Sequence, residues 1–109
     1  LSSYFSTVIV FLLSSSSYIV ADLDNYHGFE PNNDVSFECG VAWGMGINCI
    51  GFMKDCRIMK ERIPHYSEKD GGRDWCGNTV ENFNLPINLM FSTYFHIVKG
   101  DAEDALCCL

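Results

Sequence analysis

Residues 35–43, VSFECGVAW, are the stretch on which the expected fold depends. Apolar residues alternate there with small or polar ones, and a period of two residues is typical of a β-strand with one buried face. The Gly-Met-Gly sequence at 44–46 interrupts the pattern. The alternation therefore predicts a strand whose buried side chains share one parity: Val35, Phe37, Cys39, Val41 and Trp43.

The next segment, residues 48–63, changes period from two to 3.6. Its apolar residues recur at i, i+4, i+7 and i+11, which places them on one face of a helix. Asn48 is a suitable N-cap, and Pro64 ends the segment because the residue before a proline disfavours helical geometry. We predict one amphipathic helix with a buried stripe formed by Phe52, Cys56, Met59 and Ile63.

The second half of the chain predicts an antiparallel sheet. A polar loop over 65–78 leads into the apolar stretch 79–98, in which Pro86 suggests an edge position or a bulge. Residues 105–109 are a short apolar end and predict a last strand. The expected architecture is α+β, with a single helix on an antiparallel β-sheet that carries Leu89 and Phe91.

Residues 1–21 contain no charged side chain. An apolar run at 8–13, followed by serines and a small residue at Ala21, is typical of a secretory signal peptide that lacks its first residues. The alternative is a membrane anchor, since about 20 apolar residues span a bilayer. The signal interpretation predicts a secreted domain over residues 22–109.

Six cysteines on a secreted chain of this size predict disulfides. Cys49 and Cys56 would be about 10 Å apart along the predicted helix, too far to be joined. Adjacent Cys107 and Cys108 should point to opposite faces of a strand. The partners of Cys49, Cys56 and Cys76 stay open.

Charge and motif spacing argue against several ligand classes. The formal net charge is −7, which disfavours a phosphate backbone as a general partner. Asp22 and Asp24 have the spacing of a calcium loop, but His27 stands where that loop needs glycine. The absence of a Cys-x-x-Cys sequence makes zinc improbable, so we expect no metal and no cofactor. A local basic patch could still bind RNA or a partner: Lys54, Arg57, Lys60 and Arg62.

The order of the short motifs resembles a known group. Phe37-Glu38-Cys39-Gly40 comes first, then the predicted helix, then Pro64-His65-Tyr66, Leu85-Pro86-Ile87 and Gly100-Asp101-Ala102-Glu103-Asp104. This order resembles the RNase-like secreted effectors of powdery-mildew fungi, whose fold is related to the guanyl-specific fungal ribonucleases. The resemblance implies a ribonuclease-like fold over residues 35–109.

The same resemblance implies that the chain is not an enzyme. His65 matches a ribonuclease histidine that contacts the phosphate, but Asn84 stands where the general base would be, and an amide cannot take up a proton. Glu81 would lie on the other face of the strand. The position of the stabilising arginine falls near Asp104 or Ala105, neither of which is cationic. His65 is then a remnant of a lost site.

Further expectations follow from the resemblance. It implies a disulfide from Cys39 to Cys107 or Cys108, which would stabilise the fold by roughly 4 kcal/mol. It also implies a secreted monomer that is translocated into host cytoplasm, does not bind a membrane once the signal is removed, and binds a host protein such as an immune receptor, or RNA without cleavage. The alternatives are a secreted ribonuclease or other hydrolase, and an unrelated cysteine-stabilised extracellular binding module.

Overall fold

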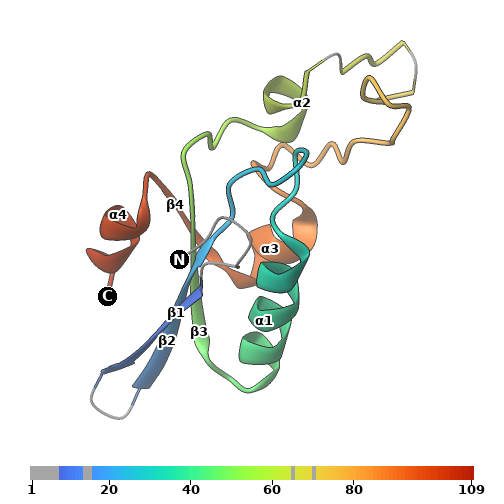
Figure 1. The fold of residues 1–109 in the computed structure, drawn as a ribbon. Coiled ribbons are helices and arrows are strands. Elements are labelled where there is room, and N and C mark those ends of the chain that lie inside the picture. The colour runs from blue at the N-terminus through green and yellow to red at the C-terminus, as the bar shows by residue number, and fades with distance from the viewer. Residues whose placement is uncertain (1–7, 14–15, 65, 70) are drawn as a thin grey trace. The chain divides into compact units, whose positions relative to one another are not determined.

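The computed structural model describes residues 8–13, 16–64, 66–69 and 71–109 (Figure 1). The chain divides into two compact units. Unit 1 comprises Leu1–Lys54 together with Tyr94–Leu109, and unit 2 comprises Asp55–Thr93. Each unit has its own internal structure and is described by itself.

Unit 1 is built on a four-stranded sheet with the strand order β1-β2-β3-β4. The strands are β1 (Val8–Leu13), β2 (Ser16–Asp22), β3 (Asn48–Met53) and β4 (His96–Lys99). β2 pairs parallel with β3, and β3 pairs parallel with β4, while β1 is an antiparallel edge strand on β2. A parallel sheet joined through helices is the arrangement of Rossmann-like α/β proteins.

Helices cover both faces of this sheet, with α1 (Asn33–Gly44) on one side and α4 (Ala102–Leu106) on the other (Figure 1). On the α4 side, Ala105 packs against the apolar side chains of β2 and β3, Val20, Ile50 and Phe52. On the other side, α1 buries a stripe of three residues, Val35, Cys39 and Ala42. The core of unit 1 is therefore made of two layers that share the sheet.

Unit 2 has little regular structure. It contains α2 (Met59–Arg62) and most of α3 (Leu89–Tyr94), whose last residue belongs to unit 1. The segment between these helices is irregular, with isolated bridges that join Arg73 to Ser67 and Thr79. The amide of Met59 donates to the carbonyl of Leu85 at 2.9 Å, which ties the start of α2 to the segment before α3.

The predicted strand over 35–43 is wrong, because these residues form α1. Asn32 caps the helix, since its side-chain oxygen accepts the amide of Asp34 at 2.7 Å. The buried residues follow helical spacing, i, i+4 and i+7. The other apolar residues of the alternation face solvent, with Phe37 exposed by 74% and Trp43 by 50%. The residues that alternate with a period of two therefore include both core residues and surface residues.

The predicted helix over 48–63 is also wrong. Its first part is β3, which is buried from Cys49 to Met53, as expected for a strand covered on both faces. Within β3, Gly51 lets the side chain of Leu23 pack directly against the backbone, because a Cβ at this position would collide with Leu23. Only 59–62 are helical within the predicted range.

The expectations for the second half of the chain fail as well. The stretch 79–98 holds α3 and the short strand β4 instead of an antiparallel sheet, and 105–109 complete α4 and its end instead of a strand. The α+β, ribonuclease-like class is therefore incorrect. The reason is that β2, β3 and β4 run parallel and are joined through helical crossovers.

The expected disulfide frame is absent, since no two of the six cysteines are joined in the structure. Cys39 is buried on the face of α1 that meets the sheet, whereas Cys107 and Cys108 are exposed at the end of α4, across the sheet. Burial raises the pKa of Cys39 to about 12, with Cys49 as a smaller contributor. Cys39 is thus a packed core group instead of one end of a cross-link, whereas Cys107 and Cys108 face solvent.

The uncharged N-terminal stretch contributes two strands to the sheet. β1 and β2 lie within 8–22, and the side chains of Ile19, Val20 and Ala21 are buried. The secretory signal over 1–21, followed by a domain at 22–109, stays a prediction. Within the described ranges, every helix is too short or too polar to cross a membrane.

Candidate functional site

Two carboxylates lie where the parallel strands of unit 1 end. Asp22 is the last residue of β2, and Asp24 follows it by two residues. The amide of Asp24 donates to Oδ1 of Asp22 at 2.9 Å, and the amide of Lys54, just after β3, donates to Oδ1 of Asp24 at 2.7 Å. The carboxyl ends of parallel strands are where α/β proteins bind ligands. The edge formed by the carboxyl ends of β2 and β3, called the carboxyl edge below, is the candidate site.

Asp22 has an electrostatic environment suited to proton transfer. Desolvation by partial burial raises the pKa of its carboxyl, and the negative charge of Asp24 adds to this effect. The hydrogen bond from the Asp24 amide and the more distant charge of Lys54 oppose it. Burial has the largest effect, so the proton is held more tightly than on an ordinary aspartate.

The loop between β2 and α1 and the first residues of α1 line an open hollow of about 550 Å³. Its wall is formed by residues 26–34, which include the aromatic rings of Tyr26 and Phe29 and the carboxylates of Glu30 and Asp34. Tyr26 and His27 form an edge-to-face pair with ring centroids 4.3 Å apart. A volume in this range, with aromatic walls and a few polar groups, suits a small organic ligand.

Helix α1, which follows β2 in the chain, carries two further acidic side chains. Asp34 lies in its first turn and Glu38 one turn later, four residues apart and hence on one face. Both side chains are exposed. Their neighbours Val35 and Cys39 are buried against the sheet, which fixes the rotation of the helix. The helix N-terminus also favours negative charge in its first turn.

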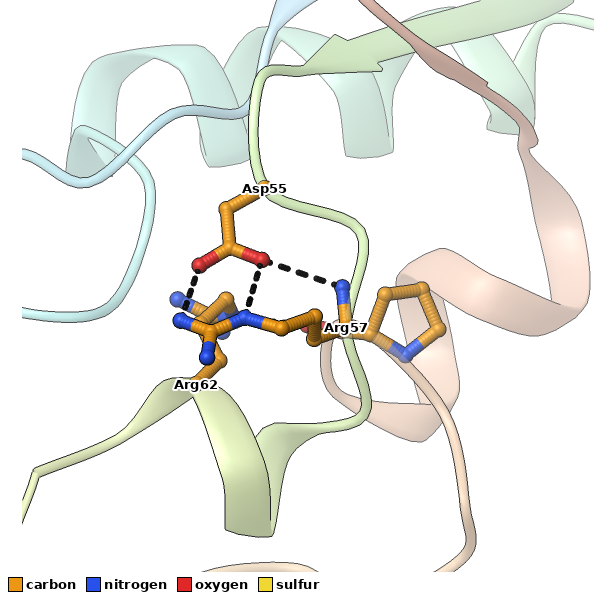
Figure 2. A network of polar contacts seen from close by, with 4 residues as sticks. Asp55, Arg57 and Arg62 are labelled. Atoms are coloured by element: carbon orange, nitrogen blue, oxygen red, sulfur yellow. Dashed lines mark hydrogen bonds and ion pairs between the residues drawn. The ribbon is translucent and has the colours of Figure 1, made fainter.

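Unit 2 contains a compact polar network around Asp55 (Figure 2). The guanidinium of Arg57 donates twice to the Asp55 carboxylate, at 2.9 Å through Nε and 2.7 Å through Nη2. These hydrogen bonds lower the pKa of Asp55 to about 2, and the charge of Arg62 adds a smaller effect. Arg62 is only 5% exposed, and its Nε donates to the carbonyl of Pro86 at 3.0 Å.

The four residues of the basic patch expected from the sequence fall in different units. Lys54 belongs to unit 1, and the other three residues belong to unit 2. Within unit 2, Arg57 is paired with Asp55, Arg62 is buried, and Nζ of Lys60 lies 3.9 Å from Glu68. RNA or partner binding by these side chains stays a prediction.

Of the two positions carried over from the ribonucleases, the structure describes only Asn84. Asn84 is exposed in an irregular segment, with a positive φ of 57°. His65 lies outside the described residues. Within the ranges that the structure describes, no three His, Cys, Asp or Glu side chains gather closely enough to hold a metal ion.

Sequence reasoning missed most of the candidate site. Asp22 and Asp24 were considered only as a calcium loop, and Glu38 only as part of an aromatic-x-Cys motif. A usable signal was present, because the apolar run ending at Asp22 is typical of a buried parallel strand, and polar residues after such strands indicate a site. The raised pKa of Asp22 depends on burial and is visible only in the structure.

The fold is that of an α/β protein, and the candidate site lies where its parallel strands end. The family model of nucleoside 2-deoxyribosyltransferase matches residues 7–90. The chain is also similar to the solved structure of a 2-desoxiribosyltransferase from Leishmania mexicana, with 32% identity and a TM-score of 0.64. That match covers 82% of this chain and 54% of the Leishmania chain, so this chain spans about half of its length. No curated protein matches the chain.

The chain therefore belongs to the nucleoside 2-deoxyribosyltransferase family. This finding corrects the resemblance to RNase-like fungal effectors and the expectation of a pseudoenzyme, because the family and the structural neighbour are transferases. The resemblance rested on short motifs in a shared order. In the structure the first of them, Phe37-Glu38-Cys39-Gly40, lies on a helix and not on a strand.

Proposed function

We propose that this protein transfers a 2-deoxyribosyl group between nucleobases, and that the reaction takes place at the carboxyl edge of the parallel sheet. The observation that carries the proposal is the position of Asp22, a partly buried carboxyl with a raised pKa at the end of β2. Membership of the family and the hollow lined by residues 26–34, on the segment that follows β2, support it.

Glycosyl transfer with two carboxyl groups explains why an acidic edge suits this reaction. One carboxylate attacks the anomeric carbon, C1′, while an acid protonates the leaving group. Here the C1′–N bond breaks, a C1′–O bond to the carboxylate forms, and the base departs with the proton. A nitrogen of the second base then attacks C1′, the carboxylate is released, and the proton of that nitrogen returns to the acid.

We assign the proton donor to Asp22. A general acid works best when its pKa lies nearer the working pH than that of an ordinary aspartate. Burial moves the pKa of Asp22 in this direction. Asp24 is engaged by the amide of Lys54, so its role is to hold the edge together and to keep negative charge beside Asp22.

We assign the nucleophile to Glu38. Helix α1 offers two exposed carboxylates, and Asp34 lies in the first turn, where it serves the positive end of the helix. Glu38 has the longer side chain and is held in register by the buried Cys39 beside it. Tyr26 and Phe29 provide aromatic surface for a base in the adjoining hollow.

The test is base exchange with the full chain. The protein is incubated with 2′-deoxyinosine and free adenine, and 2′-deoxyadenosine is measured by chromatography. We expect the new nucleoside with the unmodified chain, a loss of at least about 100-fold with Glu38→Gln, and a smaller loss with Asp34→Asn. Folding of both variants is verified by circular dichroism. If the folded, unmodified chain exchanges no base in several combinations of donor nucleoside and acceptor base, the proposal is refuted. Equal losses in both variants would refute the choice of Glu38.

A further inference from the structure

A second hollow lies at the opposite edge of the parallel sheet. It has a volume of about 510 Å³ and is lined by the start of β3, by Tyr18 near the start of β2, and by His96 at the start of β4. β3 contains six residues, so its two ends are about 16 Å apart. The hollow is therefore separate from the carboxyl edge, where the transfer reaction is proposed.

An aromatic pair forms one wall. Trp43 near the end of α1 and Tyr94 before β4 have ring centroids 4.3 Å apart and planes inclined by 45°. Both side chains line the hollow and remain about half exposed, at 50% and 43%. Large aromatic rings left open beside a cavity offer stacking surface to a planar ligand, because such rings favour offset or edge-to-face contacts.

The polar side chains that line the hollow are those of Tyr18, Asn48, Cys49, Tyr94, His96 and Cys108. Asn48, exposed at the start of β3, offers both donors and acceptors. The thiol of Cys49 already donates to the carbonyl of Ile47 at 3.3 Å. Among the described residues that line the hollow, none is Asp, Glu, Lys or Arg. Neither an anionic nor a cationic ligand would find a permanently charged partner, so the chemistry favours an uncharged molecule with hydrogen-bonding edges.

We propose that this hollow is a second binding site, and that its ligand is an uncharged planar heteroaromatic molecule of about the size of a purine base. The site goes beyond the proposed transfer reaction, since it contains none of the carboxylates assigned to that reaction. Stacking on the Trp43–Tyr94 pair supplies the contact area, and Asn48 supplies the hydrogen bonds.

Tryptophan fluorescence tests the proposed binding site directly, because Trp43 lines the hollow. The chain has one other tryptophan, Trp75. Replacing Trp75, which is 66% exposed in unit 2, with Phe leaves Trp43 as the only reporter. This Trp75→Phe chain is titrated with adenine, with excitation at the red edge of tryptophan absorption. Nicotinamide and nicotinate serve as a matched pair that differs in charge. We expect saturable quenching by adenine, and binding of nicotinate about tenfold weaker than that of nicotinamide.

Two variants in the same background separate this hollow from the carboxyl edge. Tyr94→Ala should weaken adenine binding about tenfold by removing half of the aromatic wall. Glu38→Gln should leave the binding seen by Trp43 unchanged and lower only base exchange. Asn48→Ala provides a second hollow variant should Tyr94→Ala fail to fold, and it should also weaken binding.

The outcomes decide between the two sites. Saturable quenching that is lost with Tyr94→Ala or Asn48→Ala but retained with Glu38→Gln supports the second site, even if no base exchange is found. Quenching that is not saturable, that survives in both hollow variants, or that disappears with Glu38→Gln would overturn it. Equal affinities for nicotinamide and nicotinate would overturn the assignment of an uncharged ligand.

Discussion

The carboxylate of Asp24 accepts the backbone amide of Lys54 at 2.7 Å, which joins the ends of two neighbouring parallel strands. Asp24 follows β2 and Lys54 follows β3, so this bond continues the pairing of the strands beyond the sheet. The same Asp24 donates its own amide to Asp22. One residue thus connects the architecture of the edge with the carboxyl that is proposed to move a proton.

Removing the Asp24 carboxylate should loosen this edge. We expect Asp24→Ala to lower the free energy of unfolding by about 1 kcal/mol, because the Lys54 amide loses its acceptor. Asp24→Asn keeps an acceptor oxygen and should cost less. Urea unfolding followed by circular dichroism measures both. An Asp24→Ala chain as stable as the unmodified one would show that the bond does not contribute.

The pKa of Asp22 predicts the sign of a pH effect. The native state raises this pKa above the ordinary value of 3.8, so it binds the proton more tightly than the unfolded chain. The stabilisation is full below pH 3.8 and is lost as the pH rises through the raised native pKa. At neutral pH the charged Asp22 is therefore unfavourable, and Asp22→Asn should be more stable there than the unmodified chain.

Asp101 is a control residue for which the predicted effect of pH on stability has the opposite sign. Its carboxylate accepts the amide of Asp104 in the capping box of α4, and this hydrogen bond lowers the pKa of Asp101. Its contribution is present above pH 3.8 and is lost as the pH falls through the lowered native pKa. Asp101→Asn should therefore be less stable at neutral pH. Unfolding curves from pH 3 to 7 compare the two variants, and parallel trends for both would contradict the pKa shifts.

Gly51, the one glycine of β3, is predicted not to tolerate a side chain. A Cβ at this position would collide with the side chain of Leu23, which is 1% exposed. Gly51→Ala should therefore cost about 1–3 kcal/mol through overpacking. Gly40, on the open side of α1, has nothing within 4 Å of an added Cβ, and Gly40→Ala should stabilise by about 0.5–1 kcal/mol. Thermal unfolding of the pair tests whether β3 and the end of β2 pack as described.

The two arginines near Asp55 should differ in their contribution to unit 2. Arg62 is buried and donates to the carbonyl of Pro86, so Arg62→Ala should cost about 1–3 kcal/mol. Arg57 is 60% exposed in its pair with Asp55, and its replacement by Ala should change stability little. Proteolysis within residues 55–93 provides the measurement. Faster cleavage in the Arg57 variant than in the Arg62 variant would reverse this ranking.

Part of the fold could be predicted from the sequence, and the limits have physical causes. The apolar run at 8–13 and the Ile19-Val20-Ala21 triplet are recognisable from hydropathy, but runs of this length also suit a secretory signal. In 35–43, helical and alternating patterns coincide because Val35 and Cys39 fit both periods. The deciding evidence is the exposure of Phe37, which depends on tertiary packing.

The candidate site was harder to predict than the fold. The acidic residues Asp22, Asp24, Asp34 and Glu38 are spread over 17 positions of the sequence, and no local motif collects them. Asp24 meets Lys54 because β2 and β3 run parallel, whereas Asp34 and Glu38 lie on the helix that follows β2. An antiparallel interpretation of the same residues does not bring the carboxyl ends of the two strands together.

The covalent step on Glu38 tests the central claim most directly. The full chain is mixed with a 2′-deoxynucleoside in the absence of acceptor base, quenched in acid, and analysed by intact mass and peptide mapping. We predict a mass increase of one 2-deoxyribosyl group on the peptide that contains Glu38, no such increase with Glu38→Gln, and its disappearance when free adenine is added before the quench. An unmodified mass throughout turnover, together with undiminished base exchange in the Glu38→Gln chain, would contradict the proposed mechanism.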